Sequence, residues 1–211
     1  MTAKGDGPVL GEELRGPLIA LVVERGYERR EVPFQLSSGG LSHDYVDLRR
    51  AVADGPALEL AARCVIAALY GAGVEFDAIG GMTMGADPVA HAVALVSGLA
   101  WFSVRKAAKT HGSAQRVEGA QVGRGRRVVL FEDTVSTGGS IFEALAVLTD
   151  SGAEVVAAVT LLDRGDVAGE RFSEAGIRYL PLLTYGDLGI DPVAPAAAVD
   201  APAAAVDAPA S

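Results

Sequence analysis

One segment of the chain places acidic, hydroxyl and glycine residues in an order that suits a sugar phosphate. Residues 128–140 read VVLFEDTVSTGGS, a hydrophobic run typical of a buried strand, followed by two acids, hydroxyl residues and two glycines. Carboxylates can accept hydrogen bonds from a sugar diol, and backbone N–H groups at the start of a helix can surround a phosphate. An acidic pair alone would repel a phosphate, so the segment fits best a ligand with both groups, a ribose phosphate.

The acids of this segment, Glu132 and Asp133, follow a predicted strand, 127–131, at the edge where parallel sheets bind their ligands. Gly138 and Gly139 allow backbone angles and close approaches that a Cβ atom would block. For the isolated hydroxyl residues, an ordinary strand-to-helix turn with capping side chains remains an open alternative. The complete string favours ligand binding. Its candidate residues are Glu132, Asp133, Thr134, Val135, Ser136, Thr137, Gly138, Gly139 and Ser140.

Basic residues gather in a second segment, 103–112, which reads SVRKAAKTHG and is called the basic segment below. The residues from 110 to 125 are rich in glycine and polar side chains and lack an apolar period, which predicts a mobile loop. A solvated charge run is the usual explanation of such a cluster. The neighbouring phosphate-binding segment favours an anion-binding role instead. The charged and titratable residues are Arg105, Lys106, Lys109 and His111.

Together the two segments resemble the orotate phosphoribosyltransferases, which are type I phosphoribosyltransferases. Residues 128–140 are similar to that family's motif for phosphoribosyl diphosphate (PRPP), and 105–112 match the R-K-x-x-K-x-H-G pattern of its catalytic loop. The resemblance covers roughly residues 14–190. It implies an enzyme, a pentosyltransferase, that transfers the phosphoribosyl group of PRPP to orotate. The products would be orotidine 5′-monophosphate (OMP) and pyrophosphate, in de novo pyrimidine (UMP) biosynthesis.

The resemblance also implies a role for each matching residue. The implied catalytic residues are Lys109, Glu132 and Asp133: the two acids hold the ribose, and the lysine meets the departing pyrophosphate. PRPP would be bound by the four residues of the basic segment together with 132–140. Mg²⁺ is implied as a cofactor that PRPP and pyrophosphate carry, without a metal site made by the protein. A homodimer is implied as well, with the catalytic loop shared across the interface.

Orotate recognition is assigned to Ser136 and Arg164, again by resemblance. Arg164 ends the string LLDR, and an arginine fork can bind a planar carboxylate through two parallel hydrogen bonds. A surface ion pair with Asp163 or Asp166 is the alternative. Several positions depart from the family pattern. Ser37 and Gly40 put contacts of the N-terminal part with substrate in doubt, Met84 stands where some members have a lysine in the pyrophosphate loop, and Ser136 replaces the more usual threonine but keeps the hydroxyl.

A glycine-rich turn, 80–90, reads GGMTMGADPVA between a predicted strand and helix. Backbone N–H groups in such a turn can hold a second anionic group, and in the resembled family the corresponding loop contacts pyrophosphate. Glycine-rich turns are also common for geometric reasons alone. Asp87 before Pro88 is typical of a helix cap.

Two other functions remain open on the sequence alone. One is a phosphoribosyltransferase for another base, such as a purine, because the PRPP site is shared and base selection depends on few residues. The other is a non-catalytic regulator that senses PRPP. Such regulators usually bind nucleic acid, and a net charge of −9 argues against a nucleic-acid surface.

Composition predicts a cytoplasmic protein without a membrane span. Half of the 211 residues are hydrophobic, but the longest apolar runs, such as 18–23 and 155–159, are far shorter than the roughly twenty residues that a bilayer requires. The first residues, MTAKGDGP, lack the apolar stretch of a secretory signal. Cys64 is the one cysteine, which excludes an internal disulfide and suggests a buried, inert thiol.

The predicted elements alternate between strands and helices, which indicates an α/β fold with a mainly parallel central sheet flanked by helices. The strands are predicted at 76–80, 101–104, 127–131, 155–162 and 179–183, and the helices at 56–70, 87–97, 139–151 and 166–175. A helix at 12–25 and two short strands within 34–47 would form a small N-terminal hood, within about residues 1–50. Residues 1–190 would be a single domain, and the Pro/Ala-rich tail, 191–211, would be disordered.

Overall fold

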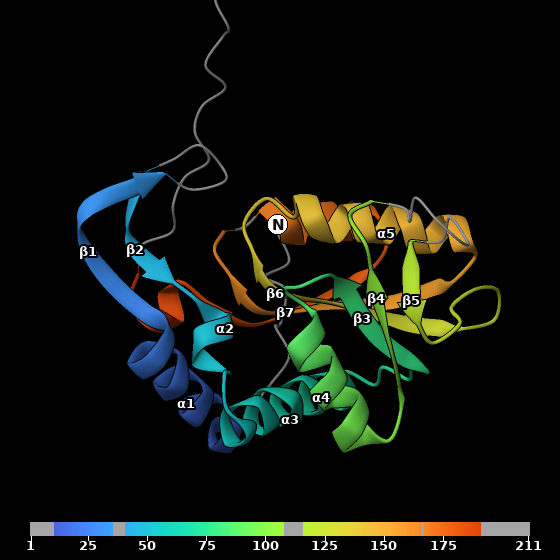
Figure 1. Ribbon diagram of the computed structural model, residues 1–211, viewed down its shortest axis with the longest axis horizontal. Coiled ribbons are helices and arrows are strands. Elements are labelled where there is room, and N and C mark those ends of the chain that lie inside the picture. The colour runs from blue at the N-terminus through green and yellow to red at the C-terminus, as the bar shows by residue number, and fades with distance from the viewer. Residues whose placement is uncertain (1–10, 36–40, 108–115, 166, 191–211) are drawn as a thin grey trace, which may run out of the picture.

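The computed structural model describes residues 11–35, 41–107, 116–165 and 167–190. They form a six-stranded sheet with helices on both faces and a separate two-stranded sheet beside it (Figure 1). The strand order is β5-β4-β3-β6-β7-β8, and all pairs are parallel except β4 with β5. The predicted fold class is therefore confirmed. The strands are β3 (Ala78–Met82), β4 (Ala100–Val104), β5 (Val117–Gly119), β6 (Arg127–Val135), β7 (Glu154–Asp163) and β8 (Arg178–Thr184).

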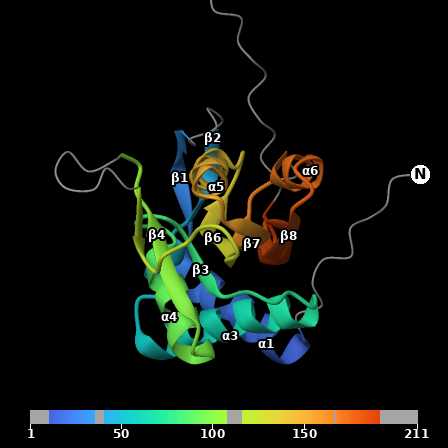
Figure 2. The same ribbon diagram turned by 90° about the vertical axis from the view of Figure 1, so that its right-hand side faces the viewer.

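Helices cover the sheet in two layers, which Figure 2 shows edge-on. The helices α1 (Glu12–Leu21), α3 (Gly55–Gly71) and α4 (Asp87–Ser97) lie on one face, and α5 (Gly139–Ser151) and α6 (Val167–Glu174) lie on the other (Figures 1 and 2). Each layer has its own hydrophobic cluster. The central strand β6 contributes to both, because successive side chains of a strand point to opposite faces: Val129 and Phe131 join one cluster, and Val128 and Leu130 join the other.

The long helix α3 begins where the sequence indicates a cap. The side chain of Asp54 accepts a hydrogen bond from the backbone N–H of Ala57 at 2.9 Å, and Pro56 occupies the first turn, where no N–H is needed. Cys64 lies fully buried on the inner face of this helix. Burial raises the pKa of its thiol to about 11, so the sulfur stays protonated, as expected of an inert cysteine.

Two predicted boundaries are wrong, and both bear on the site. The strand β6 does not end at Phe131: its ladder with β7 continues to Val135, so the two acids lie within a strand. Pairing with a long neighbouring strand extends β6 beyond its apolar run. In addition, the predicted loop 110–125 contains a strand, because Val117–Gly119 pairs antiparallel with β4. This strand is too short to show a periodic pattern in the sequence.

The hood consists of β1 (Tyr27–Gln35) and β2 (Leu41–Val46), which pair antiparallel. It follows α1 and a π-helical turn, Val22–Gly26, and is followed by the short helix α2 (Leu48–Ala51). The predicted helix 12–25 is therefore present as two joined segments, whereas the first hood strand begins at Tyr27, seven residues before the predicted start at residue 34. Ser37 and Gly40, two of the departures from the family pattern, lie outside the described residues.

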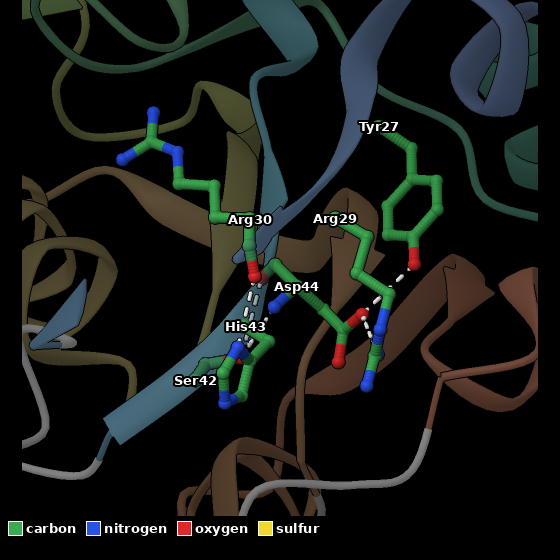
Figure 3. A network of polar contacts seen from close by, with 6 residues as sticks. All are labelled: Tyr27, Arg29, Arg30, Ser42, His43 and Asp44. Carbon is green, nitrogen blue, oxygen red and sulfur yellow. Dashed lines mark hydrogen bonds and ion pairs between the residues drawn. The ribbon is translucent and has the colours of Figure 1, made fainter. Parts of the chain in front are cut away.

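Polar contacts join the two hood strands (Figure 3). The carboxylate of Asp44 accepts hydrogen bonds from the hydroxyl of Tyr27 and from Nη1 of Arg29, both at 2.8 Å. Nδ1 of His43 lies 2.8 Å from the carbonyl oxygen of Arg30, to which it donates. These contacts are partly exposed, so the hood has a smaller apolar core than the main sheet.

The described helices are too short or too polar to cross a membrane. The predicted tail, 191–211, lies outside the described residues, as do residues 1–10.

Candidate active site

A buried carboxylate pair lies in the last third of β6. The side chain of Glu132 is only 8% exposed, and its Oε2 finds no hydrogen-bond partner among the described residues. Burial, with the charge of Asp133 beside it, raises the pKa of Glu132 to about 8, although the cation Lys106 acts in the opposite direction. An acid in this state favours a ligand that donates hydrogen bonds or brings positive charge.

The carboxylate of Asp133, unlike Oε2 of Glu132, has a hydrogen-bond partner. Its Oδ1 accepts a hydrogen bond from the backbone N–H of Thr134 at 2.8 Å. Burial raises its pKa, and that hydrogen bond and the positive charges of Arg49 and Arg164 oppose the increase. The two acids thus face cations from three other parts of the chain: Lys106 after β4, Arg49 in α2 and Arg164 after β7.

The glycine-rich turn between β3 and α4 packs against the carboxylate pair. A Cβ atom at Gly85 would lie 2.8 Å from Oδ1 of Asp133 and 3.2 Å from Oε1 of Glu132. At Gly81, a Cβ atom would lie 1.9 Å from the carbonyl oxygen of Phe131, so this position requires glycine. The turn also contains Met84, which is exposed. The glycine-rich turn singled out in the sequence therefore lies next to the two acids.

Asp87 does not cap α4 as the sequence suggests. It lies inside the first turn of the helix, after the cap residue Ala86. Its two carboxylate oxygens accept hydrogen bonds from the hydroxyls of Thr83 and Ser103, each at 2.6 Å. Since Ser103 belongs to β4, Asp87 fixes the glycine-rich turn to the strand that leads into the basic segment.

A hollow of about 320 Å³ opens beside the acids, between the end of β6 and the start of α5. It is lined by residues 136–140, which belong to the segment predicted to bind phosphate and are called the phosphate loop below; Gly138 has a φ of 80°. A Cβ atom there would lie 2.8 Å from the ring of Phe142, and a positive φ favours glycine in any case. The lining residues are Glu132, Thr134, Val135, Ser136, Thr137, Gly138, Gly139, Ser140, Ile141 and Arg164.

Arg171, in α6, supports the phosphate loop from the opposite side. Its Nη1 donates a hydrogen bond to the carbonyl oxygen of Thr137 at 2.7 Å. Its guanidinium lies over the ring of Phe142, 3.8 Å from the centroid, which is a cation–π contact. Positive charge is therefore present beside the loop as well as at the N-terminus of α5. The sequence gives no sign of this residue's role, because its partners lie in other elements.

Arg164 lines the same hollow and connects it to the hood. Its Nη2 donates to the carbonyl oxygen of Val46 at 3.0 Å, while its buried Nε finds no acceptor in the described part of the chain. The guanidinium carbon lies 5.9 Å from the ring centroid of Tyr185. Asp163, which the sequence offered as an ion-pair partner of Arg164, accepts hydrogen bonds from Gly165 and Tyr179. Asp166 lies outside the described residues.

The basic segment is described only at its beginning. Arg105 and Lys106 follow β4 directly, and Nη1 of Arg105 lies 3.4 Å from Oε1 of Glu118 in β5. The charge of Lys106 acts on Glu132, whose pKa it lowers against the effect of burial. Lys109 and His111 lie outside the described residues.

Comparisons with known proteins identify the family of this chain. A family model for the phosphoribosyl transferase domain matches residues 49–173. The orotate phosphoribosyltransferase of Streptomyces coelicolor is 44% identical over 185 residues, which cover 85% of this chain and 99% of that protein. The chain belongs to the orotate phosphoribosyltransferase family. This family consists of pentosyltransferase enzymes.

Solved structures of orotate phosphoribosyltransferases share the fold. The Mycobacterium tuberculosis H37Rv enzyme in complex with PRPP has a TM-score of 0.70 and 36% identity, covering 84% of this chain and 99% of that one. A phosphoribosyltransferase from Corynebacterium diphtheriae has a TM-score of 0.73 and 34% identity over the same shares. An adenine phosphoribosyltransferase from Leishmania donovani, 19% identical with a TM-score of 0.64, shares the fold alone.

The two acids decide how a magnesium ion would fit this site. Among the described residues, no group of three or more His, Cys, Asp or Glu side chains could enclose a metal ion. Mg²⁺ in phosphate-transfer sites commonly takes one or two carboxylates and completes its shell with phosphates and water. The unpartnered Oε2 of Glu132 and the neighbouring Asp133 could supply that contribution. The residues therefore fit Mg²⁺ that arrives with a diphosphate.

Proposed function

We propose that the protein transfers the phosphoribosyl group of PRPP to orotate, forming OMP and pyrophosphate in the de novo synthesis of UMP. One observation carries the proposal: a carboxylate of Glu132, the phosphate loop and the guanidinium of Arg164 line a single hollow of about 320 Å³. Acceptors for a sugar diol, donors for a phosphate and a donor for a base carboxylate are thus within reach of one ligand pair.

On the PRPP side, the phosphate loop binds the 5′-phosphate. Backbone N–H groups at the N-terminus of α5 and the hydroxyls of Ser136, Thr137 and Ser140 are the donors. Thr134 and Val135, at the end of β6, complete the floor of the hollow. The ribose hydroxyls donate hydrogen bonds to the carboxylates of Glu132 and Asp133. The sugar is thus held at its hydroxyls by the acids and at its 5′-phosphate by the loop.

Charge separation is the main barrier to the reaction. As the bond between C1 of the ribose and pyrophosphate breaks, positive charge grows on the sugar ring and negative charge grows on the leaving group. Glu132 and Asp133 stabilise the ring, and Arg105, Lys106, Lys109 and His111 stabilise pyrophosphate, with Lys109 as the leading catalytic residue. Interactions that strengthen only in the transition state raise the turnover, whereas equal binding of ground and transition states does not. Bound Mg²⁺ would neutralise part of the diphosphate charge.

Orotate is held next to the ribose. The carboxylate of the base accepts hydrogen bonds from Arg164, whose buried Nε has no acceptor among the described residues. The hydroxyl of Ser136 contacts the base. A guanidinium fork satisfies a planar carboxylate in a way that a lysine cannot, so the arginine favours orotate over bases that lack the carboxylate.

Exposed apolar side chains support a homodimer in which the basic segment is shared between protomers. Leu95 of α4 is 85% exposed, and it lies one helical turn after His91, whose ring contacts Trp101 of β4 at 4.3 Å between centroids. Trp101 is itself 39% exposed and lies on β4, the strand that leads into the basic segment. A Leu95→Asp variant should sediment as a monomer and lose activity; a dimer with unchanged activity would place the interface elsewhere. A cytoplasmic location and the absence of a nucleic-acid partner stay predictions.

A substrate panel tests the function. The protein is incubated with PRPP and Mg²⁺ and with one base at a time, orotate, uracil, adenine, hypoxanthine or guanine, while pyrophosphate release is followed. We expect release with orotate alone. Release with a purine would change the assignment of the base, and release with none of the five bases would indicate a PRPP-binding regulator.

A further inference from the structure

Arg116, which immediately precedes β5, donates hydrogen bonds to three acceptors in two other parts of the chain. Its Nε lies 2.9 Å from the carbonyl oxygen of Arg105, and its Nη2 lies 2.9 Å from that of Lys106. Nη2 also lies 2.5 Å from Oε1 of Glu143, in α5. The backbone adds a fourth contact, because the N–H of Arg105 donates to the carbonyl oxygen of Arg116 at 2.8 Å.

These contacts restrain the backbone of Arg105 and Lys106 more than an exposed ion pair would. A single ion pair at a protein surface contributes little, because the two side chains remain free to separate. Two of the acceptors of Arg116 are instead backbone carbonyls of consecutive residues, and the side chain is only 27% exposed. The planar guanidinium contacts these acceptors through two nitrogens, Nε and Nη2, at fixed positions, whereas a lysine has a single nitrogen.

Arg116 holds residues that belong to two parts of the proposed site. Arg105 and Lys106 begin the basic segment, and the charge of Lys106 lowers the pKa of Glu132 against the effect of burial. Glu143 lies one helical turn after Gly139, in the helix whose N-terminus ends the phosphate loop. One side chain therefore connects the first two cations to the helix that carries the phosphate loop.

We propose that Arg116 is a positioning residue for the transfer reaction: together with Glu143 it fixes the backbone of Arg105 and Lys106 relative to α5, so that both cations are directed at the leaving pyrophosphate. The inference rests on the proposed function, because the role of the two cations comes from it. Arg116 itself acts through these neighbours and does not contact the substrates.

The first test compares Arg116→Lys with Arg63→Lys. Arg63 forms an exposed ion pair with Glu59 in α3, so its variant controls for the loss of a guanidinium elsewhere. We expect Arg116→Lys to lower kcat/KM for PRPP by about tenfold to hundredfold, in line with the cost of a misplaced catalytic group. KM for orotate should stay within about twofold, because the base is held by other residues. Values within twofold of wild type for both substrates, in a folded variant, would overturn the proposal.

A double-mutant cycle tests the link to α5. If Glu143 acts only by holding Arg116, then Arg116→Lys combined with Glu143→Ala should lose little more activity than Arg116→Lys alone. Fully additive losses would show two independent roles and would contradict the proposed connection.

Hydrogen exchange separates this inference from the function itself, because it needs no substrate. The amide of Arg105 should exchange faster in Arg116→Lys than in wild type or Arg63→Lys, while amides of β6 keep their wild-type rates. Unchanged exchange at residue 105 would refute the positioning role even in an active enzyme. A wild-type protein that forms no OMP, but shows the expected exchange, would refute the proposed function alone.

Discussion

The carboxylate half of the site and the cationic half are supported by different interactions. Glu132 and Asp133 lie on β6, the strand whose side chains enter both hydrophobic clusters, so their positions depend on the packed core. Arg105 and Lys106 lie next to the short edge strand β5 and depend on the polar contacts of Arg116. Burial therefore raises the pKa values of the two acids, whereas the two cations remain in contact with solvent.

The largest loss is expected from the cationic half. Lys109→Ala should lower kcat by about 10²-fold or more, similar to the loss of one preorganised electrostatic donor elsewhere. The melting temperature should stay at the wild-type value, because the substitution removes no core contact predicted from the sequence. Single-turnover kinetics and thermal unfolding are the measurements, and Arg63→Ala serves as the control. Near-wild-type turnover would remove Lys109 from its proposed role.

The next effect concerns the buried half. Above about pH 8, where the wild-type carboxylate is charged, Glu132→Gln should lower kcat/KM for PRPP by about tenfold or more, since a hydrogen bond to a charged acceptor is replaced by one to a neutral amide. KM for orotate should change less. The variant keeps the size of the side chain, so the comparison separates charge from packing. Steady-state kinetics with each substrate varied in turn would show whether the loss is confined to PRPP.

The same substitution should change the pH dependence of stability. In the folded state the pKa of Glu132 is raised from 4.5 to about 8. Between these values the folded protein holds a proton that the unfolded chain releases, so the wild-type stability contribution of this group falls as pH rises through that window and is lost above it. The melting temperature of Glu132→Gln, measured relative to wild type, should therefore be higher at about pH 8 than at pH 5. An equal difference at both pH values would contradict the raised pKa.

Arg171 offers a smaller test, at the border between the two halves. Arg171→Met keeps an apolar contact with Phe142 but removes the hydrogen bond to Thr137 and the charge beside the phosphate loop. KM for PRPP should rise by about threefold to tenfold, with little change in kcat, because the 5′-phosphate is bound equally in the ground and transition states. Arg178→Met, on β8, is the matched control. A fall in kcat at constant KM would assign Arg171 to the chemical step instead.

The sequence alone was sufficient for the elements that combine a strong pattern with a motif. The helix after Gly138 and the strands on either side of it follow from apolar runs bounded by glycine. The structure places Glu132, Ser136 and Arg164 around one hollow, while their roles stay predictions. The C-terminal end of β6 and the whole of β5 were missed because pairing with a neighbouring strand determines them. No local pattern encodes such pairing.

The supporting residues of the site were also beyond sequence reasoning. Arg116 and Arg171 act through contacts with elements distant in the chain, and nothing in their immediate surroundings distinguishes them from other arginines. Asp87 shows the same limit: its position before proline suggested a cap, but two hydroxyls, one of them on a strand, take its carboxylate. Tertiary contacts decided its role.

The smallest effect is expected in the hood, where exposed polar contacts replace a large core. The side chain of Arg29 is 66% exposed, and Asp44 keeps a hydrogen bond from Tyr27 when Arg29 is removed. Arg29→Gln should therefore shift the melting temperature by less than about 2 °C and leave kcat unchanged. Asp44→Ala should have a larger effect, because it removes the acceptor of both residues. If the two variants lower the melting temperature equally, the hood contacts act as one cooperative network, and the contrast with the buried half of the site is smaller than their exposure suggests.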